Sequence, residues 1–332
     1  MHILRSQGEI DAIVPRRYCP MQTRIDIRYD RKGIAVNDTT KGYLWLFFTI
    51  TLFSTYEVVG SIFAQTIHPL LVNAIRFTMG GLVLLPLAIR TMRREQLKLR
   101  GADLLALFGL GFLNAGVCMG LTQYALQYTE ASTAAVLMSS NPLFVSLLSA
   151  FIFKEPLTKD KIIALLLGIG GMLLVSGGVK SANALGPVLA TLASMVWAVY
   201  TVAGKRLSQR YGSLVMNSFA FLLGGGFLLI LTALLKIPLT GFNTTNILLL
   251  IYLGVAVSGI AYYAFFTGLL YLDTTAGAAV FFFKPALATV FAFLILGEPI
   301  SMRKIAGIMV IMLAMGLVIP PVKEKVKKLF AA

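Results

Sequence analysis

The sequence contains few of the residues from which metal sites, disulfides and acid–base centres are built. It has 332 residues but only two cysteines, Cys19 and Cys118, and two histidines, His2 and His68. Two cysteines argue against a disulfide framework, and so small a set of sulfur and imidazole ligands argues against a zinc cluster. We therefore expect neither a metal nor another cofactor.

Charged residues are also scarce, at 13% of the chain, against about 25% in an average soluble domain. Hydrophobic residues make up 58%, and the mean hydropathy is +0.83. The composition therefore predicts a multi-pass protein of the cell membrane. The formal charge of +15 is typical of basic cytoplasmic loops in such proteins, so we do not expect a nucleic-acid partner.

Apolar runs follow one another closely after Gly42. About 20 residues at 1.5 Å each cover a hydrocarbon core of about 30 Å, and this criterion predicts an all-α integral membrane protein with about ten transmembrane helices. They are expected at residues 43–64, 70–90, 103–126, 131–153 and 161–179, and at 186–206, 213–235, 246–269, 276–296 and 303–321. The short connections leave little room for a soluble catalytic domain, so we do not expect an enzyme. The flanking residues 1–41 and 322–332 are polar and basic, and we expect cytoplasmic tails, the first of them disordered.

The chain contains an internal repeat. Residues 277–299 match residues 134–156, so that Lys284-Pro285 occupies the place of Asn141-Pro142, and a Glu-Pro pair follows at the same separation in each copy. Further matches join Gly42, Tyr56, Gly60, Asn73, Gly80 and Gly81 to Gly186, Tyr200, Gly204, Asn217, Gly224 and Gly225, and Gly111, Gly116 and Tyr128 to Gly254, Gly259 and Tyr271. Such self-similarity is a primary indicator of architecture, and it predicts two five-helix repeats at 42–180 and 181–321.

An odd number of helices in each repeat makes the second repeat enter the membrane from the opposite side. With the N-terminus placed inside, the inner loops and the C-terminal tail hold 15 lysines and arginines. The outer loops hold four, namely Lys180, Lys236, Arg303 and Lys304. The positive-inside rule then predicts that both termini are cytoplasmic.

Lys284 is the most unusual residue of the predicted membrane segments. A charged side chain at the centre of a spanning helix costs roughly 2.5–3.5 kcal/mol on insertion scales, and the adjacent Pro285 is expected to kink the helix. One interpretation is that Lys284 pairs with an acid and holds the helices together. The other is that it forms a cationic, substrate-binding site in a central cavity.

Glu57 is the acid that lies well inside a predicted membrane segment. It is expected either to pair with Lys284 or Arg76, or to serve as a proton or cation site that couples transport. Arg76 lies near the start of its helix and is expected to reach an interface or another side chain, with a gating contact as the alternative.

Several uncharged residues are candidates to line the same cavity. Asn141 is the repeat mate of Lys284, and its amide is expected either to join helices or to contact substrate. Aromatic side chains with polar tips are further candidates, namely Tyr56, Tyr200, Trp197, Tyr124, Tyr262 and Tyr263. All of them except Tyr262 belong to the predicted substrate site. Taken singly, each is also a normal packing residue.

Other repeated features have a structural interpretation. The glycines at 80–81 and 224–226 allow helices to approach closely, and they follow no strand, so a phosphate-binding loop is not expected. Glu155-Pro156 and Glu298-Pro299 are expected to end helices and begin turns. His68, in a short loop, is also expected to be structural.

Two copies of five helices, each with a proline-bearing helix followed by a Glu-Pro pair in KEPLT (154–158) and GEPIS (297–301), resemble the EamA-type branch of the drug/metabolite transporter superfamily. The resemblance covers residues 42–321. It implies ten helices, cytoplasmic termini, a central cavity between inverted halves, and export or exchange of small metabolites. Lysines on late helices hold the anion in the organic-phosphate relatives, but one lysine with Asn141 as its mate is a poor phosphate clamp, which favours a carboxylate or zwitterion.

The sequence thus favours a secondary transporter that moves an amino acid or a related solute across the bilayer by alternating access, with protons as a possible coupling ion. The alternative is a non-transporting membrane protein that assists assembly or handles lipid. That alternative predicts no enclosed polar cavity and a dry pair between Lys284 and Glu57.

Overall fold

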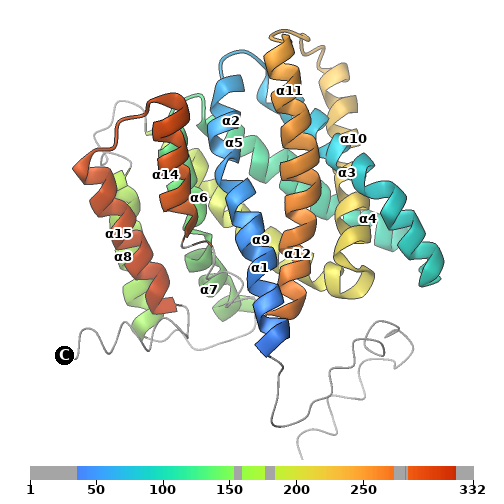
Figure 1. The fold of residues 1–332 in the computed structure, drawn as a ribbon, viewed down its shortest axis with the longest axis horizontal. Coiled ribbons are helices and arrows are strands. Elements are labelled where there is room, and N and C mark those ends of the chain that lie inside the picture. The colour runs from blue at the N-terminus through green and yellow to red at the C-terminus, as the bar shows by residue number, and fades with distance from the viewer. Residues whose placement is uncertain (1–35, 153–158, 176–183, 273–280, 282, 319–332) are drawn as a thin grey trace, which may run out of the picture. The chain divides into compact units, whose positions relative to one another are not determined.

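The computed structural model describes residues 36–152, 159–175, 184–272, 281 and 283–318 (Figure 1). Within these residues the regular structure is entirely helical. Residues 37–332 form one compact unit, whereas nearly all of the unit before them lies outside the described residues. The predicted disorder of residues 1–35, the basic tail at 322–332 and the Glu155-Pro156 turn also fall outside that part of the chain.

The first half of the chain contains α1 to α8. Their bounds are α1 Val36–Ser54, α2 Tyr56–Phe63, α3 Pro69–Arg94, α4 Gly101–Gly111, the π-helix η1 Phe112–Cys118, α5 Met119–Ala125, α6 Ala131–Ser139, α7 Asn141–Ile152 and α8 Lys159–Val175. The first helix begins at Val36, so residues 36–41 are helical although we expected them to belong to a tail.

The second half repeats this order. Its elements are α9 Leu185–Tyr211, α10 Ser213–Leu234, α11 Thr244–Tyr252, the π-helix η2 Leu253–Ala261, α12 Tyr262–Tyr271, α14 Phe283–Leu296 and α15 Met302–Val318. The π-helices η1 and η2 occupy corresponding positions in the two halves. Each inserts wider turns into a segment that was predicted as one regular helix, and such insertions are common at functional sites.

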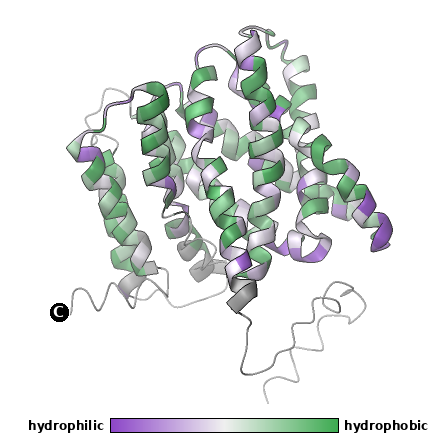
Figure 2. Cartoon of the chain, viewed as in Figure 1, coloured by the Kyte–Doolittle hydropathy of each residue, from purple (hydrophilic) through white to green (hydrophobic). Residues whose placement is uncertain are grey.

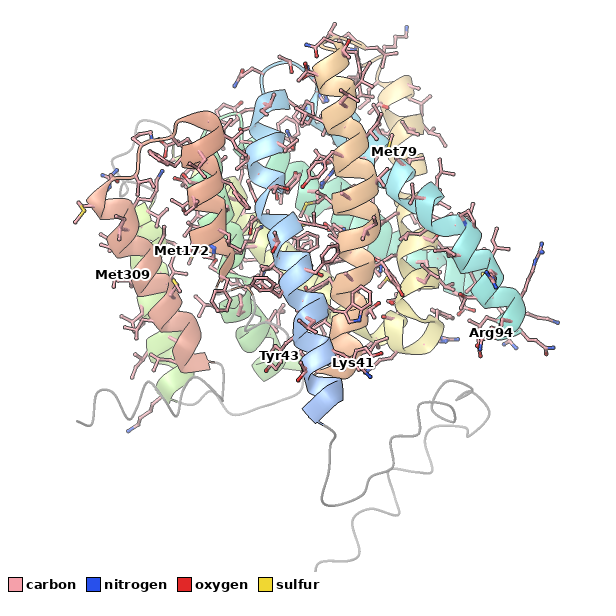
Figure 3. All side chains as sticks on the ribbon, in the orientation of Figure 1. Lys41, Tyr43, Met79, Arg94, Met172 and Met309 are labelled. Atoms are coloured by element: carbon pink, nitrogen blue, oxygen red, sulfur yellow. The ribbon has the colours of Figure 1, made fainter. Side chains whose placement is uncertain are left out.

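Six helical segments in the described residues are long and apolar enough to cross a membrane. They are Thr40–Phe63, Pro69–Arg94, Gly101–Ala125, Leu185–Tyr211, Ser213–Leu234 and Thr244–Tyr271, and shorter apolar helices lie at Ile162–Val175 and Phe283–Leu296. Hydrophobic residues run along the outside of the helices, while polar residues gather near helix ends such as the end of α3 (Figure 2). Arg94 points away from the neighbouring helices there (Figure 3). This distribution is expected for a multi-pass membrane protein.

Glycines allow α3 to pack closely against η2 and α10 of the second half. A Cβ atom on Gly80 would lie 2.9 Å from the carbonyl carbon of Ser258 in η2, and one on Gly225 of α10 would lie 2.6 Å from the Thr78 nitrogen. The backbones therefore touch directly, which is how small residues drive helix association in membranes. The packing role predicted for these glycines is confirmed.

Candidate functional site

The candidate site lies beside the starts of two helices, α7 and α14, inside the bundle. The segment predicted as one helix at 131–153 is broken at Ser140, and α7 begins with Asn141-Pro142. Lys284 and Pro285 likewise lie in the first turn of α14, which begins at Phe283. A proline in the first turn removes an N–H that would be unpaired anyway. Lys284 and Pro285 therefore stand at the start of α14, and the residues before it that were predicted to belong to the same helix lie outside the described residues apart from Phe281.

A small cavity of about 20 Å³ lies beside these two helix starts. It has room for about one water molecule. Six predicted site residues line it, namely Lys284, Asn141, Tyr56, Trp197, Glu57 and Arg76. Six further residues complete its wall, namely Phe53, Met119, Met138, Val257, Tyr262 and Phe281. Both halves of the chain contribute to the wall.

The two predicted charges of opposite sign meet across the halves. Lys284 Nζ donates to Glu57 Oε1 at 2.5 Å, and these residues are 227 positions apart in the chain. The Glu57 side chain is fully buried and that of Lys284 is 6% exposed. Glu57 Oε2, in contrast, has no hydrogen-bond partner. Of the pairings left open by the sequence, the structure contains Glu57 with Lys284, and one carboxylate oxygen stays available.

Of the two positions expected for Arg76, an interface or another side chain, the structure contains the second, and the Arg76 side chain is completely buried. Its Nε donates to Asn73 Oδ1 one helical turn earlier, at 3.0 Å. The guanidinium carbon lies 4.2 Å from the centre of the Tyr56 ring and 4.4 Å from that of Phe77. Stacking of this kind stabilises a desolvated cation. Nη2, however, has no hydrogen-bond partner, and no ion pair with Arg76 occurs among the described residues.

The charged groups around the cavity do not balance. Glu57 contributes one negative charge, whereas Lys284 and Arg76 contribute two positive charges. Burying an ion without a partner costs several kcal/mol, so the excess positive charge makes the cavity a favourable place for an anion. Arg76 is well suited to this role, because its guanidinium has several donors and can bind a carboxylate through two of them.

The remaining wall of the cavity is aromatic. Phe53 and Tyr262 pack with ring centres 4.9 Å apart, and Trp197 lies 5.5 Å from Tyr262. Phe281 lies 6.5 Å from Trp197. Trp197 Nε1 has no hydrogen-bond partner, which leaves one donor in an otherwise apolar wall.

Three predicted substrate contacts are not part of the cavity. Tyr200 packs behind Trp197 with ring centres 5.3 Å apart. Tyr124 lies against His68, with 3.5 Å between its hydroxyl and Nε2, and Tyr263 packs edge-on against Trp45.

Two predicted residues of the lining have clear structural contacts as well. Asn141 donates to the carbonyl of Met138 at 3.3 Å across the helix break. The Tyr56 hydroxyl donates to Gln123 Oε1 at 3.1 Å, and Gln123 in turn donates to the Gly60 carbonyl at 2.7 Å. The Tyr56 ring is thereby fixed beneath the guanidinium of Arg76.

One cavity residue that the sequence prediction missed, Phe53, could have been found from its spacing. Phe53 lies four residues before Glu57, which places both on one face of a regular helix. Tyr262 was an aromatic candidate that the predicted site left out, and it lines the cavity, whereas its neighbour Tyr263 does not. Tyr262 directly follows η2, and a π-helix changes the direction in which the next side chains point.

Known proteins similar to this chain include several named as transporters. The model of the EamA-like transporter family matches residues 40–177 and 184–319. An uncharacterized transporter of Clostridium kluyveri is 34% identical over 82% of this chain and 91% of its own length. Protein PecM of Dickeya dadantii is 30% identical over 63% and 71%, respectively. A protein of known crystal structure has the same fold with a TM-score of 0.64 at 21% identity, over 86% of this chain and 98% of the other.

Proposed function

We propose a specific transport function for this chain, which belongs to the EamA-like transporter family. It is a secondary transporter of the plasma membrane, built from ten transmembrane helices in two inverted five-helix repeats at 42–180 and 181–321. Both termini are cytoplasmic. The double match of the family model supports the two repeats, and the excess of lysine and arginine in the inner loops supports the orientation.

The solute carries a carboxylate. The single observation behind this proposal is Arg76, which lines the cavity and whose buried Nη2 has no hydrogen-bond partner. Leaving a buried charged donor without a partner is costly, so a carboxylate that binds Nη2 supplies a hydrogen bond that the protein alone does not. Lys284 lines the same cavity and gives the anion a second cation.

The solute also carries an ammonium group. Glu57 Oε2 is buried and has no partner, so it can accept from a second cation without losing Lys284 at Oε1. A zwitterion with one carboxylate and one ammonium matches the two unsatisfied groups, and the rings of Phe53, Trp197 and Tyr262 give its apolar part a surface to pack on. An amino acid or a close relative is the solute class that meets these conditions.

Transport proceeds by alternating access, in the direction of export. A cavity of about 20 Å³ is far below the roughly 300 Å³ of a small ligand site, so the solute enters only when the halves move apart. Glu57 lies in the first half and Lys284 in the second. Their ion pair neutralises the buried carboxylate of Glu57 while the two halves are in contact. Solute or a proton at Glu57 then competes with this pair, which couples binding to opening.

A membrane assembly or lipid-handling function is the second candidate. The buried pair of Glu57 and Lys284 favours it, whereas a cavity lined by Glu57, Arg76 and Lys284 does not. It differs from a transporter in one respect that can be measured, because it moves no solute.

Flux from proteoliposomes separates the two candidates. Vesicles are loaded with individual amino acids and, in parallel, with their carboxamides, which keep the ammonium and lose the carboxylate. We expect protein-dependent efflux of at least one amino acid, no efflux of its amide, and loss of the efflux in Arg76→Gln but not in the control Arg94→Gln, which alters an exposed arginine. Equal movement of acid and amide, or full activity of Arg76→Gln, contradicts the carboxylate assignment. Absence of any flux favours the second candidate.

A further inference from the structure

Glu298 does more than end a helix, although the sequence suggested only that role. It follows Gly297, whose positive φ of 68° turns the chain after α14. Its Oε1 accepts from the backbone nitrogen of Ala131 at 2.6 Å, and Oε2 accepts from that of Ser132 at 3.1 Å and from the Ser132 hydroxyl. The carboxylate of one half therefore caps the first turn of α6 in the other half.

Lys304 closes the same contact from α15. Its Nζ donates to the Ser132 hydroxyl at 2.7 Å and pairs with Glu130. The Lys304 side chain is only 6% exposed, whereas that of Glu130 is 46% exposed, so the ammonium is buried and its partner lies at the surface. Glu298 and Lys304 together hold the start of α6 between a carboxylate and an ammonium.

This cap is unusual because it does not come from the helix itself. The first backbone N–H groups of a helix need acceptors, and a side chain at the N-cap position normally supplies one. Glu130 occupies that position in α6 and makes no capping hydrogen bond. The acceptor comes instead from Glu298, 167 residues after Ala131. Two backbone N–H groups in the first turn of α6, those of Ala131 and Ser132, have these acceptors only while the two halves stay in contact.

The capped helix connects this contact to the cavity. α6 has only nine residues, and Met138 near its other end lines the cavity. α6 also packs against α14, which carries Lys284 into the same cavity. A contact at the start of α6 therefore acts on two neighbouring helices that both contribute to the cavity wall.

We propose that Glu298, Ser132, Lys304 and Glu130 form the outer gate latch of the protein. The latch lies at the ends of α6, α14 and α15 that the charge distribution predicts to be outside. While it is formed, α6 and α14 stay together and the cavity is closed to the outside; when it opens, the α6 cap is lost and solute can leave. This inference rests on the proposed transport function, because only a transporter needs a gate.

Accessibility of the cavity from outside tests the latch without any solute. A reporter, Val257→Cys, places a thiol in the cavity wall, where Val257 is buried and belongs to η2 rather than to a latch helix. The background carries Cys19→Ser and Cys118→Ala. Intact cells are treated with a membrane-impermeant maleimide, and the labelling rate is compared for the reporter alone, with Glu298→Gln, and with the control Glu95→Gln.

We expect Glu298→Gln to raise the labelling rate about tenfold. The carboxylate accepts three hydrogen bonds from Ala131 and Ser132, whereas the amide has one acceptor oxygen and no charge to strengthen the bonds that remain. Lys304→Met, which leaves the Glu298 cap intact, raises the rate by a smaller factor. Glu95→Gln leaves it unchanged, because Glu95 contacts only its neighbour Arg94 in the ion pairs of the described residues. Unchanged labelling in Glu298→Gln, or an equal rise in Glu95→Gln, overturns the latch.

Thermal unfolding distinguishes a gate from a purely structural contact. A gate variant labels faster from outside, while its labelling rate from the cytoplasmic side does not increase and its melting temperature does not fall. If both latch variants label faster from both sides and melt earlier, the contact is structural and the proposal is wrong. Failure of the transport proposal looks different: wild-type protein then moves no solute, whatever the labelling rates are.

Discussion

Removing either partner of the buried ion pair in the cavity should destabilise the protein, but not equally. Glu57→Leu and Lys284→Met replace each charged side chain by an apolar one of similar size, and the double variant combines them. Breaking a buried pair costs about 3–5 kcal/mol, because the remaining charge loses its partner. This range applies here because Glu57 and Lys284 are both almost completely buried.

The expected order of the two single variants follows from the third charge. Without Lys284, the carboxylate of Glu57 still shares the cavity wall with Arg76, and the charges around the cavity balance. Without Glu57, Lys284 and Arg76 remain together with no carboxylate. Glu57→Leu should therefore lose free energy of unfolding near the upper end of about 3–5 kcal/mol, and Lys284→Met near or below the lower end.

The double variant, Glu57→Leu with Lys284→Met, completes a double-mutant cycle. It removes both charges of the pair and keeps the net charge of the wild-type cavity, so its free energy of unfolding should lie closer to wild type than that of Glu57→Leu. Reversible unfolding in mixed micelles, with Glu95→Gln as surface control, measures all four values. The reasoning is refuted if Lys284→Met is the less stable single variant, or if the losses of the single variants simply add in the double variant.

Two further predictions concern the packing and the pH dependence of the described helices. Gly225→Ala should lower the melting temperature because its Cβ would lie 2.6 Å from the Thr78 nitrogen, and overpacking costs about 1–3 kcal/mol. The control Gly226→Ala should be close to neutral, because its Cβ would meet nothing within 4 Å. Equal melting temperatures for the two variants would contradict the backbone contact at Gly225. His68 Nδ1 accepts from the Leu70 backbone nitrogen, and burial lowers the pKa of His68 below its usual 6.5. The unfolded chain therefore binds the proton more readily, so the contribution of His68 to stability is greatest above pH 6.5 and falls as the pH drops below it. His68→Asn should reduce the change in melting temperature between pH 7 and 5. If the melting temperature of the variant depends on pH as steeply as that of the wild type, His68 makes no such contribution.

Much of the fold could be predicted because its causes are local or repeated. Apolar length locates membrane segments, and the match of Lys284-Pro285 to Asn141-Pro142 reveals the duplication without any structure. The two helix starts inside the bundle were not foreseen, because a proline is compatible both with a kinked helix and with the first turn of a new one. Only the surrounding packing decides between them.

The charged residues of the site could be predicted from the sequence, but their pairing could not. Glu57 and Lys284 stand out because ionisable residues in membrane segments are costly, but their pairing joins positions 227 residues apart, and the sequence offered Arg76 as an equal partner. The burial of Arg76 depends on stacking with Tyr56, a contact between two separate helices. The contact of Glu298 with the start of α6 also joins distant elements, so the Glu-Pro pair alone indicated only a turn.

The central claim is that the cavity beside Arg76 and Lys284 binds the carboxylate of a solute. Protection of the Val257→Cys thiol from a small maleimide tests it most directly, with the purified protein, the amino acid found in the flux assay, and the amide of that amino acid. The account predicts that the acid slows labelling in a saturable manner, that the amide does not, and that Arg76→Gln abolishes the protection. Equal protection by acid and amide, or protection that survives in Arg76→Gln, would contradict it.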